Sequence, residues 1–166
     1  MERTLVVIRH AKSDWGVPAG DRERPLAARG RRQAPHVGLW NAAHLDPLDV
    51  AIVSPATRAR QTWELAAAEL PTPPPVRVEP DAYAFDGEAL LEIVARLPTD
   101  ATTAALVGHN PAVEELVEDL AGQWVRMPTA ALAVVRLREW NDGRGRLLAA
   151  GRPADGPLEL DRGAPA

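Results

Sequence analysis

Cysteine is absent from this chain of 166 residues, which excludes disulfide bonds, cysteine nucleophiles and thiolate metal sites. Aromatic residues are scarce, at 4%, so aliphatic side chains must build most of the core. Long apolar runs are also missing, since none approaches the roughly 20 residues that a membrane-spanning helix needs. The apolar run at residues 5–8 is too short for a signal peptide, and we therefore expect a cytoplasmic protein.

No excess of one charge sign marks the chain as a binder of a highly charged partner. It carries 19 Lys and Arg against 23 Asp and Glu, mixed along its length, for a net charge of -4. Neither a nucleic acid nor a membrane surface is therefore expected as a partner. The length suits one domain with a substantial core, and 46% hydrophobic residues is ordinary for a globular protein.

Short apolar runs alternate with amphipathic segments along most of the chain. Strands are predicted at residues 5–8, 50–53, 76–78 and 104–107, the first of them buried on both faces, and a closing hairpin at residues 131–137 and 146–150. Thr57 and Asp86 are predicted to cap helices, and Pro111 to open one. Pro35 either kinks the first helix or lies near its start. The alternation predicts one α/β domain at residues 1–150 with a mainly parallel sheet.

Residues 151–166 are rich in Pro, Gly and charge, which predicts a loosely ordered tail.

Polar residues follow three of the predicted strands at the points where these strands end. Arg9 and His10 follow the first strand, residues 54–58 follow the second, and Gly108 and His109 follow the fourth. In parallel α/β sheets, ligands bind beyond the carboxyl ends of the strands. We therefore expect the three clusters to meet at one site.

The residue types in these clusters suit phosphoryl transfer. A phosphoryl group presents three charged oxygens, and the planar guanidinium groups of Arg9 and Arg58 can bind them. The amino end of the helix near Thr57 would add a partial positive charge. His10 and His109 could supply a nucleophilic imidazole and a second hydrogen-bond donor.

Other interpretations of the same residues must be weighed. An Arg-His pair after a strand is often structural, and His10 and His109 could instead bind a metal ion. The neighbouring Arg and Lys residues oppose a cation, however, and no third ligand is evident. We interpret His36 and His44, which lie within or at the end of a predicted helix, as structural or solvated.

Three segments together resemble the histidine phosphatase superfamily. Residues 5–11 (LVVIRHA) resemble its strand and RHG signature, residues 54–62 (SPATRARQT) its SPxxRAxQT segment, and residues 106–111 (LVGHNP) its second histidine segment. The resemblance covers about residues 4–150. It implies a three-layer α/β/α sandwich of the phosphoglycerate-mutase-like type, with no metal and no cofactor.

Within that superfamily, residues 9–15 (RHAKSDW) and the DxxRPL segment at residues 21–26 are most similar to the SixA-type phosphohistidine phosphatases. The resemblance implies that His10 is the nucleophile and becomes a phosphohistidine intermediate. It also implies that Arg9, Arg58 and His109 form the phosphate pocket, with Arg24 as a further pocket arginine. In the reaction that we expect, His109 is protonated when it holds a phosphoryl oxygen. The implied enzyme is a hydrolase acting on a phosphohistidine-bearing protein or a small phosphorylated substrate.

Two departures from the superfamily pattern bear on the chemistry. The glycine of the RHG signature is Ala11 here, so the turn after His10 must tolerate a Cβ atom. The usual carboxylic general acid has no clear counterpart, and Asp86 or Glu88 could serve as that acid or only cap a helix. An alkoxide leaving group needs such a proton donor, whereas the imidazole of phosphohistidine can take its proton from solvent. The pattern therefore favours phosphohistidine as the substrate.

Alternative functions remain open at this stage. A broad-specificity small-molecule phosphomonoesterase of the same superfamily would use Asp86 or Glu88 as its acid. A non-catalytic phosphate-binding module would keep the pocket but lose turnover, which the full set of Arg and His residues argues against. Mutase activity is disfavoured because the chain has little inserted sequence with which to retain a bisphosphorylated intermediate.

Overall fold

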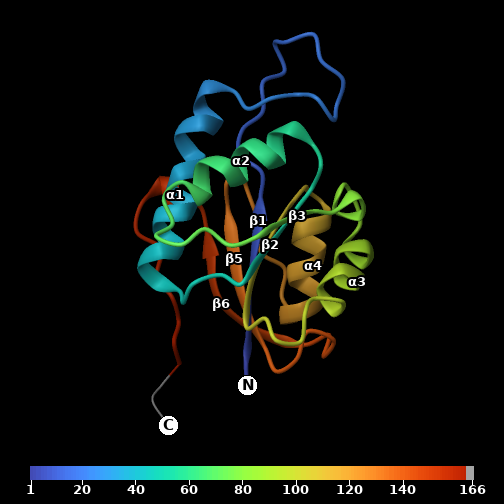
Figure 1. Cartoon of the computed structure of the whole chain (residues 1–166), viewed down its shortest axis with the longest axis vertical. Coiled ribbons are helices and arrows are strands. Elements are labelled where there is room, and N and C mark those ends of the chain that lie inside the picture. The colour runs from blue at the N-terminus through green and yellow to red at the C-terminus, as the bar shows by residue number, and fades with distance from the viewer. Residues whose placement is uncertain (164–166) are drawn as a thin grey trace.

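A six-stranded sheet forms the centre of the computed structural model, which describes residues 1–163 (Figure 1). The strands are β1 (Arg3–Arg9), β2 (Val50–Val53), β3 (Val76–Val78), β4 (Thr103–Gly108), β5 (Leu132–Leu137) and β6 (Gly145–Gly151). The helices are α1 (Ala28–His44), α2 (Thr57–Ala67), α3 (Gly87–Ala95) and α4 (Ala112–Ala121), with short 3-10 turns at Pro80–Ala82 and Pro153–Asp155. None of the helices in the described part of the chain is long and apolar enough to cross a membrane.

The strand order is β3-β2-β4-β1-β5-β6. The four strands from β3 to β1 run parallel, while β5 and β6 pair antiparallel at the other side of the sheet. This arrangement confirms the predicted α/β class and mainly parallel sheet. The antiparallel part is the predicted closing hairpin, whose short connection allows the chain to reverse directly.

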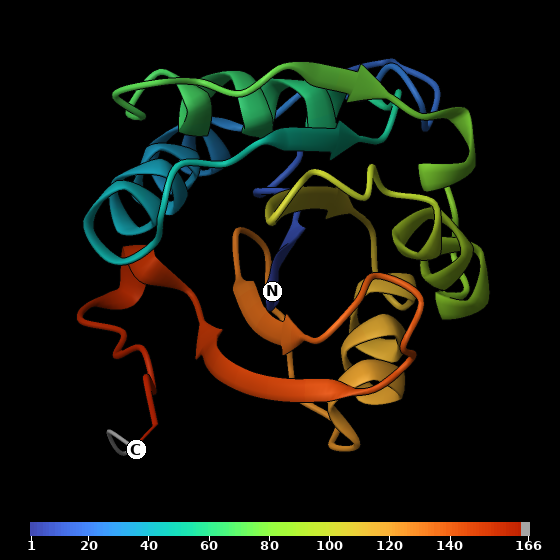
Figure 2. The same ribbon diagram turned by 60° about the horizontal axis from the view of Figure 1, so that its bottom comes forward.

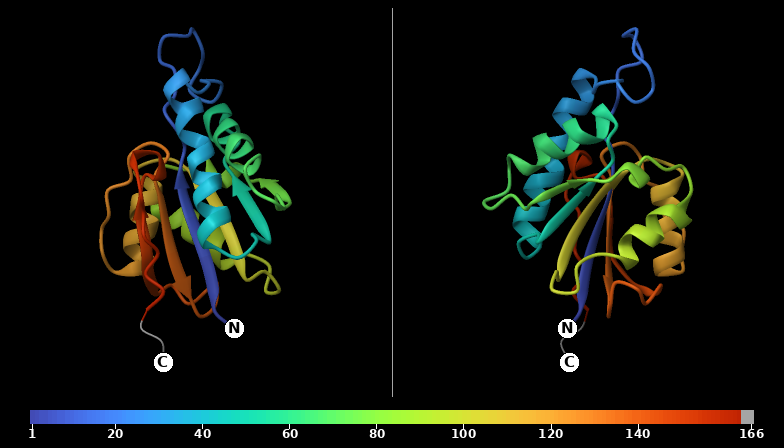
Figure 3. Two further views of the ribbon diagram at one scale, coloured as in Figure 1. Left: turned by 90° about the vertical axis from the view of Figure 1, so that its left-hand side faces the viewer. Right: turned by 45° about the vertical axis from the view of Figure 1, so that its right-hand side comes forward.

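Helices cover both faces of the sheet, as the side view in Figure 3 and the view in Figure 2 show. The alternating side chains of β1 explain why both faces are apolar. Leu5 and Val7 pack in the core beneath α3 and α4, while Val6 and Ile8 pack in the core beneath α1 and α2. A strand buried on both faces needs an uninterrupted apolar run, which residues 5–8 supply.

The helix starts agree with the sequence in part. Asp86 caps α3 as predicted, since its Oδ1 accepts the Ala89 N–H at 3.0 Å. The prediction that Thr57 caps α2 was wrong, because Thr57 is the first helical residue and Ala56 precedes it without a side-chain cap. The backbone N–H of Thr57 donates instead to Arg22 O at 2.8 Å, which ties the start of α2 to the loop after β1.

Part of the expected tail packs against the domain. Leu158 and Leu160 lie against the core beneath α1 and α2, and Leu158 O accepts the indole N–H of Trp40 at 2.8 Å. Two leucines are enough to bind this segment to apolar surface, although the segment as a whole is polar. Its overall composition therefore did not predict the contact. The last three residues, 164–166, lie outside the described residues.

The carboxyl ends of β1, β2 and β4 lie side by side because these strands are neighbours in the sheet. The loop after β1 extends beyond this edge, at the top of Figure 1, before the chain enters α1. Helix α1 packs closely on the start of this loop, since a Cβ atom on Gly30 would lie 2.1 Å from Lys12 O. Only glycine permits this approach, which fixes the backbone that follows β1.

Candidate active site

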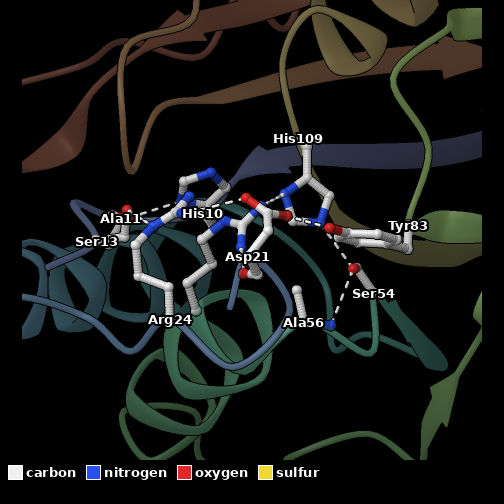
Figure 4. Close-up of polar contacts among 10 residues, drawn as sticks. His10, Ala11, Ser13, Asp21, Arg24, Ser54, Ala56, Tyr83 and His109 are labelled. Carbon is white, nitrogen blue, oxygen red and sulfur yellow. Dashed lines mark hydrogen bonds and ion pairs between the residues drawn. The ribbon is translucent and has the colours of Figure 1, made fainter. Parts of the chain in front are cut away.

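A pocket of about 260 Å³ lies at the carboxyl edge of the sheet, where the three polar clusters meet. All five residues proposed from the sequence line it, namely Arg9, His10, Arg24, Arg58 and His109. Its other lining residues are Lys12, Ser13, Trp15, Asp21, Phe85, Asn110 and Thr129. The loop after β1, the start of α2 and the end of β4 therefore all contribute to one site, part of which Figure 4 shows.

His10 immediately follows β1, and hydrogen bonds fix both its backbone and its ring. Its backbone N–H donates to Gly108 O at 3.1 Å, which ties it to the end of β4. Its Nδ1 lies 2.7 Å from Ala11 O. A carbonyl oxygen can only accept, so Nδ1 carries the proton, and in the neutral ring Nε2 has a free lone pair. Burial lowers the pKa of His10 to about 3, assisted by the positive charges of Arg58 and Arg9, so the ring is neutral at neutral pH.

Ala11 fits the turn after His10 without backbone strain. It is fully buried, and its N–H donates to Thr62 Oγ1 at 2.9 Å. Within residues 1–163, the only residue other than glycine with a positive φ is Ala130. The backbone at position 11 therefore does not require glycine, and the departure from the RHG signature leaves the geometry of His10 intact.

His109 lies beside His10, with the two ring centroids 5.2 Å apart. The guanidinium of Arg58 has no acceptor, so its Nη2 donates to His109 Nδ1 at 3.3 Å. The remaining ring proton is on Nε2, which donates to Ser54 Oγ at 2.7 Å. Burial and the charge of Arg58 lower the pKa of His109 to about 4. In the pocket without a bound phosphoryl group, His109 is therefore neutral, whereas the sequence led us to expect a protonated ring. The negative charge of a phosphoryl group would raise the pKa of His109 again.

Three guanidinium groups give the pocket its positive charge. Arg58, in the first turn of α2, is 2% exposed, and Arg9 donates from Nη1 to Met127 O at 3.1 Å. The Nε atoms of both arginines are buried without a hydrogen-bond partner in the described chain. Arg24 donates from Nε to Ser13 Oγ at 3.0 Å and stacks on Trp15, 3.7 Å from the ring centroid. Clustered, partly unsatisfied cations destabilise a fold unless an anion neutralises them, so the electrostatics of the pocket suit an anionic ligand.

Asp21 is the carboxylate among the pocket residues that the sequence did not indicate as part of the site. Its carboxylate pairs with Arg24 at 3.0 Å and Arg58 at 3.2 Å, and it also accepts the phenolic O–H of Tyr83. The Tyr83 hydrogen bond and the two arginines lower the pKa of Asp21 to about 2. The DxxRPL segment placed Asp21 three residues before Arg24, but no local signal linked either residue to Tyr83, 62 residues away.

The two carboxylates considered as a general acid lie elsewhere. Asp86 caps α3, and Glu88 is an exposed residue in the first turn of the same helix. Neither lines the pocket, and Asp21 is the only carboxylate among its described lining residues. Within residues 1–163, no group of three His, Asp or Glu side chains lies close enough together to hold a metal ion.

The low pKa values of the two histidines predict a fold that weakens in mild acid. Between pH 6.5 and about 4, the unfolded chain binds protons at His10 and His109 that the folded chain does not bind. Stability should therefore fall as pH falls through this range, by up to about 1.4 kcal/mol per pH unit for each histidine. Urea denaturation between pH 7 and pH 4.5 measures the slope. The His10→Ala variant should show a shallower one, and identical slopes in the two proteins would contradict a neutral, buried His10.

Comparison with known proteins finds similar chains that cover nearly the whole domain. An uncharacterised protein of Mycobacterium tuberculosis (strain H37Rv) is 33% identical over 147 residues, which is 81% of this chain and 90% of that protein. The structure of the protein histidine phosphatase SixA complexed with tungstate superposes with a TM-score of 0.81 at 25% identity, covering 92% of this chain and 98% of the other. A candidate phosphohistidine phosphatase SixA of Nakamurella multipartitia gives a TM-score of 0.83 at 28% identity, covering 92% and 97%.

The sheet edge, the arginine-lined pocket and these similar structures define an α/β protein of the phosphatase class. The family model of the histidine phosphatase superfamily (branch 1) matches residues 5–83. The chain belongs to this superfamily, and its fold is that of the phosphoglycerate-mutase-like SixA structures. Arg9, His10, Arg24 and Arg58 lie within the matched residues, while His109 lies beyond them.

Proposed function

We propose that the protein is a phosphohistidine phosphatase in which His10 accepts the phosphoryl group from a phosphorylated histidine of a protein. The observation that carries this proposal is the orientation of His10. Because Nδ1–H donates to Ala11 O, Nε2 is the nitrogen with a free lone pair, and the low pKa keeps it unprotonated at neutral pH. A neutral imidazole fixed in one tautomer beside three arginines is suited to attack phosphorus.

The reaction proceeds in two displacements at phosphorus. In the first, a bond forms between His10 Nε2 and phosphorus while the bond to the substrate's imidazole nitrogen breaks, and the departing imidazole takes a proton from solvent. In the second, a water oxygen bonds to phosphorus, the bond to Nε2 breaks, and inorganic phosphate leaves. Arg9, Arg24 and Arg58 stabilise the charge on the phosphoryl oxygens in both steps. That charge also raises the pKa of His109, which favours its protonation once the phosphoryl group is bound.

No protonated carboxyl group is found among the described pocket residues, which supports a nitrogen-bound phosphoryl group as the substrate. Asp21 is ionised because Tyr83, Arg58 and Arg24 lower its pKa to about 2, so it carries no proton to donate at neutral pH. Asp86 and Glu88 do not line the pocket. A serine or sugar alkoxide leaving without a proton is a poor leaving group, whereas an imidazole protonated from solvent leaves readily. The likeness to SixA structures, described as a protein histidine phosphatase and a candidate phosphohistidine phosphatase, supports the same substrate.

Substrate preference tests the proposal. We expect kcat/KM for a phosphohistidine protein to exceed that for phosphoserine and sugar phosphates by about 100-fold or more, because a general acid contributes on the order of 10²- to 10⁴-fold. p-Nitrophenyl phosphate is the matched control, since its phenolate leaves without a proton. Its turnover should lie well above that of phosphoserine. Equal rates on phosphoserine, sugar phosphates and phosphohistidine would instead identify a broad small-molecule phosphomonoesterase.

A further inference from the structure

The Asp21 carboxylate lies among the groups that should hold the phosphoryl oxygens. Its Oδ1 accepts from Arg24 Nη1 at 3.0 Å, and its Oδ2 accepts from Arg58 Nη2 at 3.2 Å and from the Tyr83 hydroxyl. Figure 4 shows this carboxylate between Arg24, Tyr83 and the ring of His109. A carboxylate and a phosphoryl group both present anionic oxygens to a guanidinium fork, so Asp21 resembles part of the ligand that the pocket should bind.

Three of the five N–H donors of Arg58 are used by the protein, and both N–H groups of Nη2 are among them. Its Nη2 donates to Asp21 Oδ2 and His109 Nδ1, and its Nη1 donates to the backbone carbonyl of Asp21. Its Nε is buried and has no partner within the described residues. A phosphoryl oxygen can therefore hydrogen-bond to Arg58 Nη2 on the Asp21 side only when the Asp21 carboxylate gives up its contact there.

We propose that Asp21 is an internal competitor of phosphate, which occupies the arginines of the pocket and which a phosphoryl substrate must displace. The proposal deepens the proposed function and rests on it only in taking this pocket as the phosphate site. Its consequence is selectivity. Inorganic phosphate, which offers only its own oxygens, must overcome the full cost of displacing Asp21. A phosphorylated side chain on a protein can offset that cost with further contacts, for which the exposed rings of Trp15 and Phe85 lie at the pocket.

The placement of Asp21 suits a group that moves aside. It lies in a turn of the loop between β1 and α1, outside any helix or strand, and its side chain is 46% exposed. A small rotation toward solvent would leave its charge hydrated rather than buried, so displacement carries little desolvation cost. Tyr83 opposes that movement, because its hydroxyl holds Oδ2 in the pocket.

Phosphate binding measured by calorimetry tests the proposal without any assay of turnover. Inorganic phosphate is titrated into the unaltered protein and into the Asp21→Asn and Glu23→Gln variants at neutral pH. Glu23 is the matched control, because it is an exposed residue of the same loop that does not line the pocket. We expect the Kd for phosphate to fall at least about 10-fold in Asp21→Asn and to change less than twofold in Glu23→Gln.

A second variant keeps the test decisive. Tyr83→Phe removes the hydroxyl that holds Asp21 and should lower the Kd for phosphate about two- to fivefold, including in the case where Asp21→Asn does not fold. A Kd that rises or stays unchanged in the variants that fold would overturn the proposal and show that Asp21 positions the arginines. Equal tightening in Glu23→Gln would overturn it in favour of a general charge effect. Failure of the unaltered protein to bind phosphate would count against the proposed function as well. Tighter phosphate binding by Asp21→Asn would support the competitor role of Asp21 whichever phosphorylated substrate the enzyme hydrolyses.

Discussion

Replacing His10 by alanine should abolish turnover and remove the phosphorylated form of the enzyme. The imidazole is the only group that we propose to bond covalently to phosphorus, and loss of a covalent nucleophile typically costs on the order of 10⁵-fold or more in kcat. Rapid acid-free quenching after exposure to a radioactive phosphohistidine protein should trap an acid-labile label on the unaltered enzyme and none on the variant. Phosphate release, followed in parallel, should fall to the background rate.

His36→Ala is the matched control for this substitution. His36 is exposed on α1 and does not line the pocket, so this variant should keep full activity and full labelling. The fold of His10→Ala should survive, because a buried imidazole with a pKa lowered to about 3 contributes no favourable charge interaction to the native state. Labelling that persists in His10→Ala, or turnover within tenfold of the unaltered enzyme, would disprove the covalent mechanism.

The architecture and four of the five proposed site residues could be predicted from sequence for a common physical reason, whereas Arg24 was indicated only by the resemblance of its DxxRPL segment. A parallel sheet buried on both faces requires uninterrupted apolar runs, which makes its strands and their carboxyl ends visible in the sequence. Arg9 is the last residue of β1, His10 and His109 directly follow β1 and β4, and Arg58 follows β2 after a short turn. Their meeting in one pocket was therefore a consequence of strand order rather than of any long-range side-chain pattern.

The contacts that tune the site could not be predicted in the same way. Asp21 meets Tyr83 across 62 residues, and the pairing depends on how two loops fold over the sheet edge rather than on periodicity. The neutral state of His109 depends on its burial and on the position of Arg58, neither of which local sequence defines. The residue type of Thr57 predicts a helix cap, but Thr57 is the first residue of α2, and its backbone N–H donates to Arg22 O. Tertiary contacts of this kind override local preference.

Replacing Arg58 by alanine should produce the second-largest effect, a loss of about 10²- to 10³-fold in kcat/KM. Arg58 is 2% exposed and contacts both His109 and Asp21, so we expect its charge to act on the phosphoryl group in a poorly solvated place. Removing one preorganised donor of this kind typically costs that factor, because the charge that develops in the transition state loses its partner. Arg60→Ala is the control, since Arg60 is exposed on the same helix, and it should change kcat/KM less than twofold.

Thermal stability with added phosphate separates this role from a structural one. At about 100 times its Kd, a ligand stabilises the native state by roughly 2.7 kcal/mol, and a hundredfold loss of affinity reduces that gain to about 0.4 kcal/mol. Phosphate should therefore raise the Tm of the unaltered enzyme and of Arg60→Ala, while the Tm of Arg58→Ala should stay nearly constant. If Arg58 only supported the fold, its removal would lower the Tm without phosphate and leave the phosphate-dependent increase intact. The size of that increase, rather than the starting Tm, decides whether the buried guanidinium exists to bind phosphate.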